Sequence, residues 1–284
     1  MDNNQKKYIL VTGATGQLGS DIVSELKKRN LDVIGVGSSD LDITDESAVK
    51  KFFSENNFSH VIHSAAYTKV DLAETEKELN YKINVIGTRN IVNECKKYDV
   101  PLTYFSTDYV FGGEGTEPHK VDDKVNPLCE YAKAKLEGEK CVRELKKYFI
   151  IRISWIYGKN GSNFVKTMLK LSETRTELKV VADQIGSPTY TIDIAKVVAD
   201  IIDKDKYGTY HVTNEGYVSW ADFAREIFKI KNKKVNVIDT TTEEYAATAN
   251  RPKNSRLDKS KLYELGFDKM PDWRDALMRF LKEI

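Results

Sequence analysis

Cysteine is scarce in this chain, and long apolar runs are missing. Its 284 residues include three cysteines, Cys95, Cys129 and Cys141, which form no CxxC pair and no cysteine and histidine spacing typical of a metal site. An odd number of scattered cysteines predicts free thiols in a reducing compartment, so we expect a cytoplasmic protein. The N-terminal stretch MDNNQKKYILVTG holds too short an apolar run for a secretory signal, and no segment approaches the ~20 apolar residues that span a bilayer.

Neither sign of charge prevails. The chain has 44 lysine and arginine residues against 43 aspartate and glutamate residues, which leaves a net charge of +1. The lysines alternate with acidic residues, as in GEKCVRELKKY, which predicts solvated helix faces and no basic patch. The composition therefore gives no electrostatic reason to expect a nucleic acid or a membrane surface as a partner.

Short β-branched runs alternate with stretches of helical period, which predicts an α/β protein with a parallel sheet. We expect strands at residues 8–12, 32–36, 60–63, 102–106 and 149–153, and helices between them, among them 17–29 and 83–98. Because crossover connections in such sheets are right-handed, the carboxyl ends of the strands should meet at one edge. The expected fold class is a Rossmann-type doubly wound parallel sheet with a smaller C-terminal substrate-binding lobe.

The alternation loosens after residue 158. Helices are expected at 163–171, 192–202 and 220–228, strands at 179–182 and 209–212, and two more helices near the C-terminus. No internal repeat and no low-complexity linker interrupts the chain, so the lobe should pack onto the main domain. We expect residues 1–158 plus about 191–212 to form the main domain, and about 159–190 plus 213–284 to form the lobe.

A glycine-rich turn follows the first expected strand. In VTGATGQLGSDIV, Gly13, Gly16 and Gly19 stand at GxxGxxG spacing between a strand and a helix. Glycine permits a tight turn, lets the backbone approach a pyrophosphate and lets the helix sit close to the strand. The helix N-terminus adds free N–H groups and a positive dipole end. The position after the first strand favours a dinucleotide site over an ordinary strand-to-helix turn.

This spacing resembles the TGxxGxxG turn of the extended short-chain dehydrogenase superfamily, which binds NAD(P). Many NAD-preferring relatives carry an acidic residue at the end of the second strand, where this chain reads VGSS. With no carboxylate to repel a 2′-phosphate, we expect NADPH to be accepted, with Ser38 and Ser39 helping to hold it, while use of NADH stays open. Asp42 and Ile43 resemble the dipeptide that lines the adenine pocket.

One tyrosine precedes a lysine by four residues in NPLCEYAKAKLEGEK. Positions four apart share a helix face, so Tyr131 and Lys135 should point the same way, whereas Lys133 should point elsewhere. A phenol has a pKa near 10, and a neighbouring ammonium lowers it by favouring phenolate. In a lysine-rich helix such a pair is often coincidence, and Tyr109 is a rival phenol without a lysine at helical spacing.

The segment FSTDYVFGG follows the fourth strand and should bring Thr107 to the same edge as the glycine turn. Thr107, Tyr131 and Lys135 then match the Ser/Thr, Tyr and Lys set of the short-chain dehydrogenases. The resemblance implies that Tyr131 donates a proton, that Lys135 tunes it and binds the nicotinamide ribose, and that Thr107 polarises the substrate carbonyl.

Seven segments in the same order resemble the dTDP-4-dehydrorhamnose reductase family over nearly the whole chain: GATGQLG, SAAYTKVDLAE, FSTDYVFGG, NPLCEYAKAKLEGE, RISWIYG, ADQIGSPTYTIDIA and RPKNSRLD. That family reduces the C4 keto group of dTDP-4-dehydro-β-L-rhamnose to give dTDP-β-L-rhamnose, the last step of dTDP-rhamnose biosynthesis for cell-surface polysaccharide. The resemblance implies a NAD(P)-binding main domain and a sugar-nucleotide-binding lobe.

The resemblance also implies two sets of binding residues. Trp155 would stack against the substrate or belong to the core, and Arg251 would pair with the diphosphate or form a surface ion pair. The expected cofactor-binding residues are Gly13, Thr15, Gly16, Gln17, Leu18, Gly19, Ser38, Ser39, Asp42, Ile43, Ala65, Ala66, Tyr67, Thr68, Ser106, Tyr131 and Lys135. The expected substrate-binding residues are Thr107, Asp108, Val110, Phe111, Trp155, Gln184 and Arg251.

Other functions remain open at this point. Sugar-nucleotide epimerases and other reductases of the superfamily share the glycine turn and YxxxK, although STDYVF and DQxGxPT favour the dTDP-4-dehydrorhamnose reductases. Some relatives are non-enzymatic regulatory subunits that bind a nucleotide and a partner protein. Some family members form dimers bridged by Mg²⁺ through clustered glutamates, and the sequence reveals no such cluster. We therefore assign no metal-binding residue, while the resemblance leaves Mg²⁺ open, and we expect either a monomer or a homodimer.

Overall fold

A central parallel sheet organises the computed structural model, which describes residues 6–284, so the first five residues of the expected 1–158 segment lie outside it. The strand order is β10-β5-β4-β3-β1-β2. The strands are β1 (Tyr8–Thr12), β2 (Val33–Val36), β3 (Phe58–His63), β4 (Leu102–Thr107), β5 (Tyr148–Ile153) and β10 (Gly208–His211). The order reverses at β1, which has β2 on one side and β3 on the other. Ligands of doubly wound folds bind beyond the carboxyl ends of the strands at such a point.

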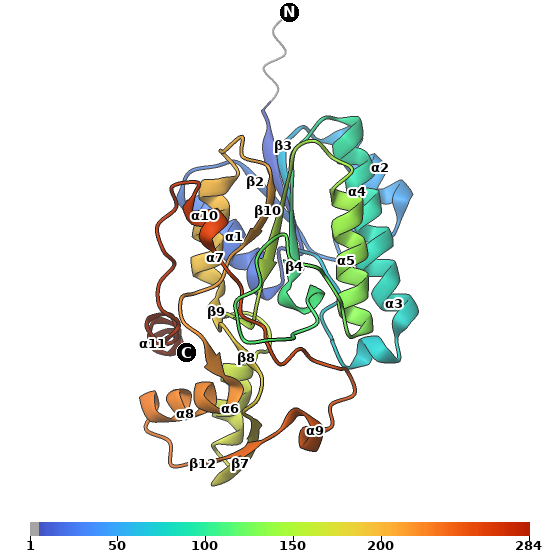
Figure 1. Cartoon of the computed structure of the whole chain (residues 1–284). Coiled ribbons are helices and arrows are strands. Elements are labelled where there is room, and N and C mark those ends of the chain that lie inside the picture. Colours follow the sequence, from blue (N-terminus) through green and yellow to red (C-terminus); the bar gives the residue numbers. More distant parts are fainter. Residues whose placement is uncertain (1–5) are drawn as a thin grey trace, which may run out of the picture.

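Helices cover both faces of the sheet (Figure 1). Leu10 and Ile150 face one helix layer, whereas Ile9 and Ile151 face the other, because successive side chains of a strand point to opposite sides. One layer contains α2 (Glu46–Glu55), α4 (Thr88–Lys97) and α5 (Glu130–Val142), and the other contains α1 (Gln17–Lys28), α7 (Thr191–Ile201) and α10 (Ser260–Tyr263). The expected fold class is confirmed.

The C-terminal lobe has an apolar core of its own at the end of the sheet where the strands finish (Figure 1). This core includes Tyr157, Phe223, Trp273 and Phe280. Its elements are α6 (Phe164–Leu171), β7 (Glu177–Val181), α8 (Trp220–Ile230), β12 (Asn236–Thr240), α9 (Thr242–Tyr245) and α11 (Trp273–Glu283). Four short strands connect the lobe to the sheet: β6 (Ile156–Tyr157), β8 (Ile185–Gly186), β9 (Thr189–Tyr190) and β11 (Val218–Ser219).

The expected helix at 83–98 is interrupted. The chain forms a short 3₁₀ turn (Leu72–Glu74), α3 (Lys77–Tyr81) and a π-helix (Lys82–Gly87) before α4 begins. Asn84 lies in the π-helix, and its buried amide accepts from the Tyr67 nitrogen and donates to the Tyr67 oxygen, each at 3.0 Å. Such single wide turns often mark functional sites. Here the π-helix connects the helix layer to the loop that follows β3, through the hydrogen bonds between Asn84 and Tyr67.

The other expected elements occur within two residues of their predicted boundaries. The pairing of β7 with β12 and the four short strands were not expected, because each depends on a partner far away in the chain. Across residues 6–284, no helix has both the length and the apolarity required to cross a membrane.

Candidate active site

A cleft of about 830 Å³ opens beyond the carboxyl ends of the central strands. Its walls come from the glycine turn after β1, from the residues that follow β2 to β5, and from the lobe. Of the predicted site residues, the following line it: Gly13, Thr15, Gly16, Gln17, Leu18, Gly19, Ser38, Asp42, Ile43, Ala65, Ala66, Thr68, Ser106, Thr107, Asp108, Tyr131, Lys135 and Trp155. The fold thus brings together groups that are up to 142 residues apart in the chain, from Gly13 to Trp155.

The glycine turn is tightly packed. Gly13 has a φ of +69°, and a Cβ there would lie 2.6 Å from the Ala65 nitrogen. A Cβ on Gly19 would lie 2.2 Å from the Gly13 oxygen, so only glycine lets α1 begin this close to β1. The N-cap of α1 is Gly16, and the first turn holds no acidic residue. The positive end of the helix dipole therefore faces the cleft without a carboxylate to neutralise it, as an anion site requires.

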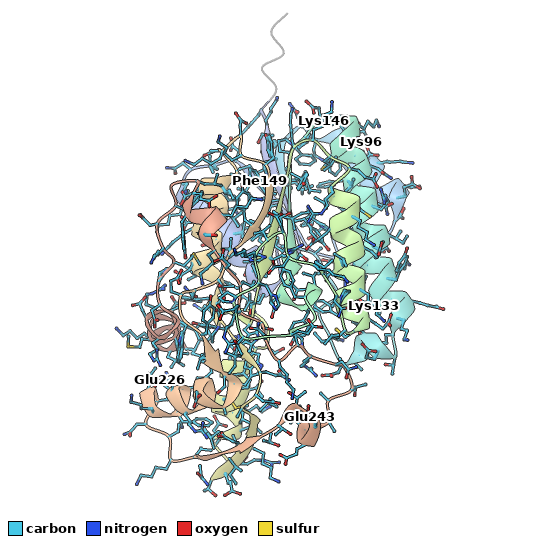
Figure 2. The ribbon with its side chains drawn as sticks, viewed as in Figure 1. Lys96, Lys133, Lys146, Phe149, Glu226 and Glu243 are labelled. Carbon is cyan, nitrogen blue, oxygen red and sulfur yellow. The ribbon has the colours of Figure 1, made fainter. Side chains whose placement is uncertain are left out.

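Tyr131 and Lys135 lie one turn apart on α5 and both line the cleft. Lys135 is 3% exposed, and its Nζ lies 4.0 Å from the centroid of the Tyr104 ring. Lys133 points outward from the same helix, where it pairs with Glu130 at 2.9 Å (Figure 2). The structure thus separates the lysine that faces the cleft from its exposed neighbour, as the helical spacing predicts.

The protonation of this pair differs from the expectation. Burial lowers the pKa of the Lys135 ammonium to about 7, while the negative charge of Glu139 opposes that shift. Burial, reinforced by the charge of Asp108, raises the pKa of the Tyr131 phenol above its ordinary value, and Thr107 opposes this only in part. In the ligand-free protein these shifts run against the expected lowering of the Tyr131 pKa by Lys135, which stays a prediction for the cofactor-bound enzyme. Desolvation outweighs the neighbouring charge because both side chains lie in the interior.

Thr107 and Asp108 form a short hydrogen-bonded unit at the end of β4. The Thr107 hydroxyl donates to Asp108 Oδ1 at 2.9 Å and accepts from the Tyr109 nitrogen at 3.1 Å. Asp108 is 3% exposed, and its Oδ2 has no hydrogen-bond partner within residues 6–284. Burial raises the pKa of the Asp108 carboxyl to about 6, although nearby hydroxyls oppose the shift. Asp108 lines the cleft, although its Oδ2 is itself buried.

Six predicted residues do not line the cleft: Ser39, Tyr67, Val110, Phe111, Gln184 and Arg251. Val110 and Phe111 are fully buried in a small apolar cluster, and the Phe111 ring stacks on His119 at 4.5 Å. The Tyr67 hydroxyl donates to Glu76 at 2.7 Å, and the Gln184 amide donates to a lobe threonine at 3.1 Å. Ser39 is exposed to solvent.

Trp155 and Arg251 both have partners in the ligand-free protein. Trp155 adopts a left-handed conformation with φ of +49°, and its ring stacks on Trp220 at 3.6 Å. A Cβ on Gly186 would come within 2.7 Å of the Trp155 ring, so little of that ring is free to stack on a ligand. Arg251 pairs with Asp71 through two bonds of 3.0 and 2.6 Å and is not part of the cleft wall.

Sequence reasoning missed several residues of the cleft wall. Ser64 and Ser154 follow β3 and β5, so the rule that identified Thr107 after β4 could have found them. Ser162 and Trp220 come from the lobe, and no local pattern marks them as cleft residues. In residues 6–284 there is no group of three or more histidine, cysteine, aspartate or glutamate side chains that could hold a metal ion.

Comparison with known proteins agrees with this geometry. The family model described as the RmlD substrate binding domain matches residues 6–284. A dTDP-4-dehydrorhamnose reductase from Aggregatibacter actinomycetemcomitans is 40% identical over 283 residues, which cover 95% of this chain and 96% of that protein. The chain belongs to the dTDP-4-dehydrorhamnose reductase family.

Two further similarities extend over almost the full length of this family member. The spore coat polysaccharide biosynthesis protein SpsK of Bacillus subtilis is 42% identical over 276 residues, with 97% of each chain covered. A crystal structure of dTDP-4-dehydrorhamnose reductase from Bacillus anthracis in complex with NADP has a TM-score of 0.95 and 45% identity, covering 99% of this chain and 100% of that one. This member of the dTDP-4-dehydrorhamnose reductase family is therefore an oxidoreductase.

Proposed function

We propose that this enzyme uses NADPH to reduce the C4 keto group of dTDP-4-dehydro-β-L-rhamnose to dTDP-β-L-rhamnose. The observation that carries the proposal is that Thr107, Tyr131 and Lys135 line the same cleft as the glycine turn. The reaction would be the last step of dTDP-rhamnose synthesis for cell-surface polysaccharide, a role that the similarity to a spore coat polysaccharide protein supports.

The cleft fits a nicotinamide dinucleotide. The open N-terminus of α1 at Gly16 suits the pyrophosphate, and Ser38 at the end of β2 offers a hydroxyl to a 2′-phosphate. The NADP complex of the Bacillus anthracis relative supports NADPH as the cofactor. Bound there, NADPH would supply the hydride to the substrate's carbonyl carbon. Lys135, buried beside Tyr131, would bind the nicotinamide ribose through its ammonium donors.

Proton delivery would fall to Tyr131. The raised pKa of this phenol keeps the proton on its hydroxyl at neutral pH, so Tyr131 enters the reaction as an acid. As negative charge develops on the substrate O4, the phenol proton moves to that oxygen and leaves a phenolate, which the Lys135 ammonium one turn away stabilises. Thr107 would donate a hydrogen bond to O4, which requires its hydroxyl to leave Asp108 Oδ1.

The sugar nucleotide would lie between the main domain and the lobe. We propose that residues 6–158 and about 191–212 hold the cofactor, while about 159–190 and 213–284 hold the sugar nucleotide. Trp220 and Ser162 of the lobe support this division, since they line the cleft beside main-domain residues. The free, buried cysteines support a cytoplasmic location, and the oligomeric state stays open between a monomer and a homodimer.

The test compares two phenols of the same cleft. NADPH oxidation is followed by its near-ultraviolet absorbance with dTDP-4-dehydro-β-L-rhamnose as substrate, and the product is identified by NMR. Tyr131→Phe should lower kcat by about 10²–10⁴-fold and leave NADPH affinity nearly unchanged. Tyr109→Phe is the matched control, because the Tyr109 and Tyr131 rings pack edge to face with their centroids 6.4 Å apart.

Near-wild-type turnover of Tyr131→Phe, or loss of activity in Tyr109→Phe alone, would contradict the assignment of the acid. Repeating the assay with NADH determines the cofactor preference. An absence of NADPH oxidation by the wild-type enzyme would contradict the reductase proposal itself.

A further inference from the structure

A buried ion pair joins α5 to the sheet one helical turn beyond Lys135. Glu139 is fully buried on α5, and Arg152 on β5 is 2% exposed. The Arg152 guanidinium donates from Nε to Glu139 Oε1 at 2.8 Å and from Nη2 to Oε2 at 2.9 Å. Arg143 adds a third bond to Oε2 at 3.1 Å. This geometry fixes both carboxyl oxygens, as in the strongest class of charge-assisted pair.

The Arg152 end of the pair is rigidly held. Its Nη1 donates to the Val121 oxygen at 3.0 Å, and its guanidinium lies 5.0 Å from the centroid of the Phe111 ring. Arg152 is also the register partner of Ser106, the residue before Thr107 on β4. Because these contacts fix Arg152 on the sheet, a shift of Glu139 along the sheet would break the hydrogen bonds between the two side chains.

Glu139 is also the charged group that acts on Lys135. Lys135 is four residues earlier on the same helix, so both side chains lie on the face of α5 that meets the sheet. Two titratable groups packed against Lys135, Tyr104 and His63, are kept in their neutral forms by burial. Burial raises the pKa of Tyr104 on β4 well above its ordinary value, and burial lowers the pKa of His63 on β3 to about 3.

We propose that Glu139 is a positioning residue for the reduction: its pairing with Arg152 fixes α5 on the sheet, and its negative charge favours the ammonium form of Lys135 against the effect of burial. The inference rests on the proposed function for the role of Lys135. Glu139 touches neither substrate nor cofactor in this scheme, since it is not part of the cleft wall. It acts through Lys135, and thereby on the acidity of Tyr131.

The variant Glu139→Gln separates charge from packing, because the amide has the size of the carboxyl and keeps one acceptor for Arg152. It removes the negative charge and leaves the positive charge of Arg152 without a counter-charge, and both changes should lower the pKa of Lys135. Two quantities are measured as a function of pH: kcat/KM, and the dissociation constant of NADPH, which is determined on the free enzyme by cofactor fluorescence. The loss of activity and the loss of NADPH affinity at alkaline pH should both begin about one pH unit or more lower than in the wild type.

Two further variants complete the experiment. Glu137→Gln is the control, because Glu137 lies on the same helix but is 45% exposed and pairs with Lys140; its profiles should match the wild type. If Glu139→Gln does not fold, the double variant Glu139→Gln/Arg152→Met removes both buried charges. The pH at which the double variant loses activity and NADPH affinity should lie between those of the wild type and Glu139→Gln, because the guanidinium that repels the Lys135 ammonium is removed as well.

A merely structural role predicts a different result. Activity would then fall by the same factor at every pH, and the pH dependence of NADPH affinity would keep its wild-type position in the single or the double variant. That outcome overturns the proposal. If the wild type reduces no sugar nucleotide, the proposed function fails, yet the NADPH affinity profiles still test Glu139.

Discussion

The Asp108→Asn substitution should stabilise the folded protein at neutral pH by about 3 kcal/mol. Asp108 is 3% exposed, and burial raises the pKa of its carboxyl from 3.8 to about 6. Each pKa unit corresponds to about 1.4 kcal/mol, so ionising Asp108 in the fold costs about 3 kcal/mol more than in the unfolded chain. Asparagine cannot ionise, and its amide can still exchange hydrogen bonds with the neighbouring hydroxyls of Ser154 and Ser255.

The pH dependence has a definite sign. A carboxyl with a raised pKa binds its proton more tightly in the folded state, so this group's contribution to stability is largest below pH 3.8 and is lost as pH rises toward about 6. The wild type should therefore lose about 3 kcal/mol of unfolding free energy over this window relative to Asp108→Asn. Above the window the difference should stay constant.

Urea unfolding of both proteins at about pH 4 and about pH 8 measures this difference, because the other carboxyls titrate equally in the two and cancel. Asp122→Asn, at an exposed carboxylate, is the control and should change neither stability nor its pH dependence. If Asp108→Asn is less stable than the wild type at pH 8, or if the difference is the same at both pH values, the account of Asp108 as a strained buried carboxylate is refuted. The same variant should bind the substrate more weakly, as expected where a site keeps an unfavourable charge for its function.

Two further pairs of substitutions test the cofactor and substrate ends of the cleft. Gly19→Ala should lower the free energy of unfolding by about 1–3 kcal/mol in urea titrations, because its Cβ would overlap the Gly13 oxygen. Gly16→Ala, whose Cβ would lie 3.1 Å from the same oxygen, should cost less stability, and equal effects would contradict the packing of the turn. If Arg251 binds the substrate diphosphate, Asp71 competes with the diphosphate for Arg251. Asp71→Asn should then lower KM by about 5-fold, and Arg251→Met should raise KM. Unchanged KM values in both variants would assign the ion pair to structure alone.

Much of the fold and part of the cleft follow from local pattern. The three glycines, the helical spacing of Tyr131 and Lys135, and Thr107 after β4 each depend on a rule that acts within one strand, turn or helix. The sheet then carries these short segments to one edge because all its central strands are parallel. Knowing which segments are strands therefore places the first one or two residues after each central strand near the cleft, but not those further along, such as Val110 and Phe111.

Contacts between distant segments could not be predicted in this way. The burial of Phe111 depends on His119 and Leu257, and the stack of Trp155 on Trp220 depends on where α8 packs. No periodicity in either segment contains that information. The side chains assigned to the substrate by family resemblance alone were the ones most often used elsewhere, because resemblance transfers a position without its packing.

The pKa of Tyr131 shows the same limit at the level of electrostatics. The spacing of Tyr131 and Lys135 indicates that the lysine ammonium can act on the tyrosine phenol. It gives no information on desolvation, which depends on the whole surrounding fold. Both groups are pushed toward their neutral forms in the ligand-free protein, and the ionised Asp108 pushes Tyr131 further in that direction. The negative charge of a bound dinucleotide would favour the ammonium form of Lys135, and a ligand that neutralises or hydrogen-bonds Asp108 would weaken that carboxylate's effect on the phenol. In the proposed mechanism, occupation of the cleft would therefore lower the pKa of Tyr131, so that the acid becomes competent when the keto group is present to receive its proton.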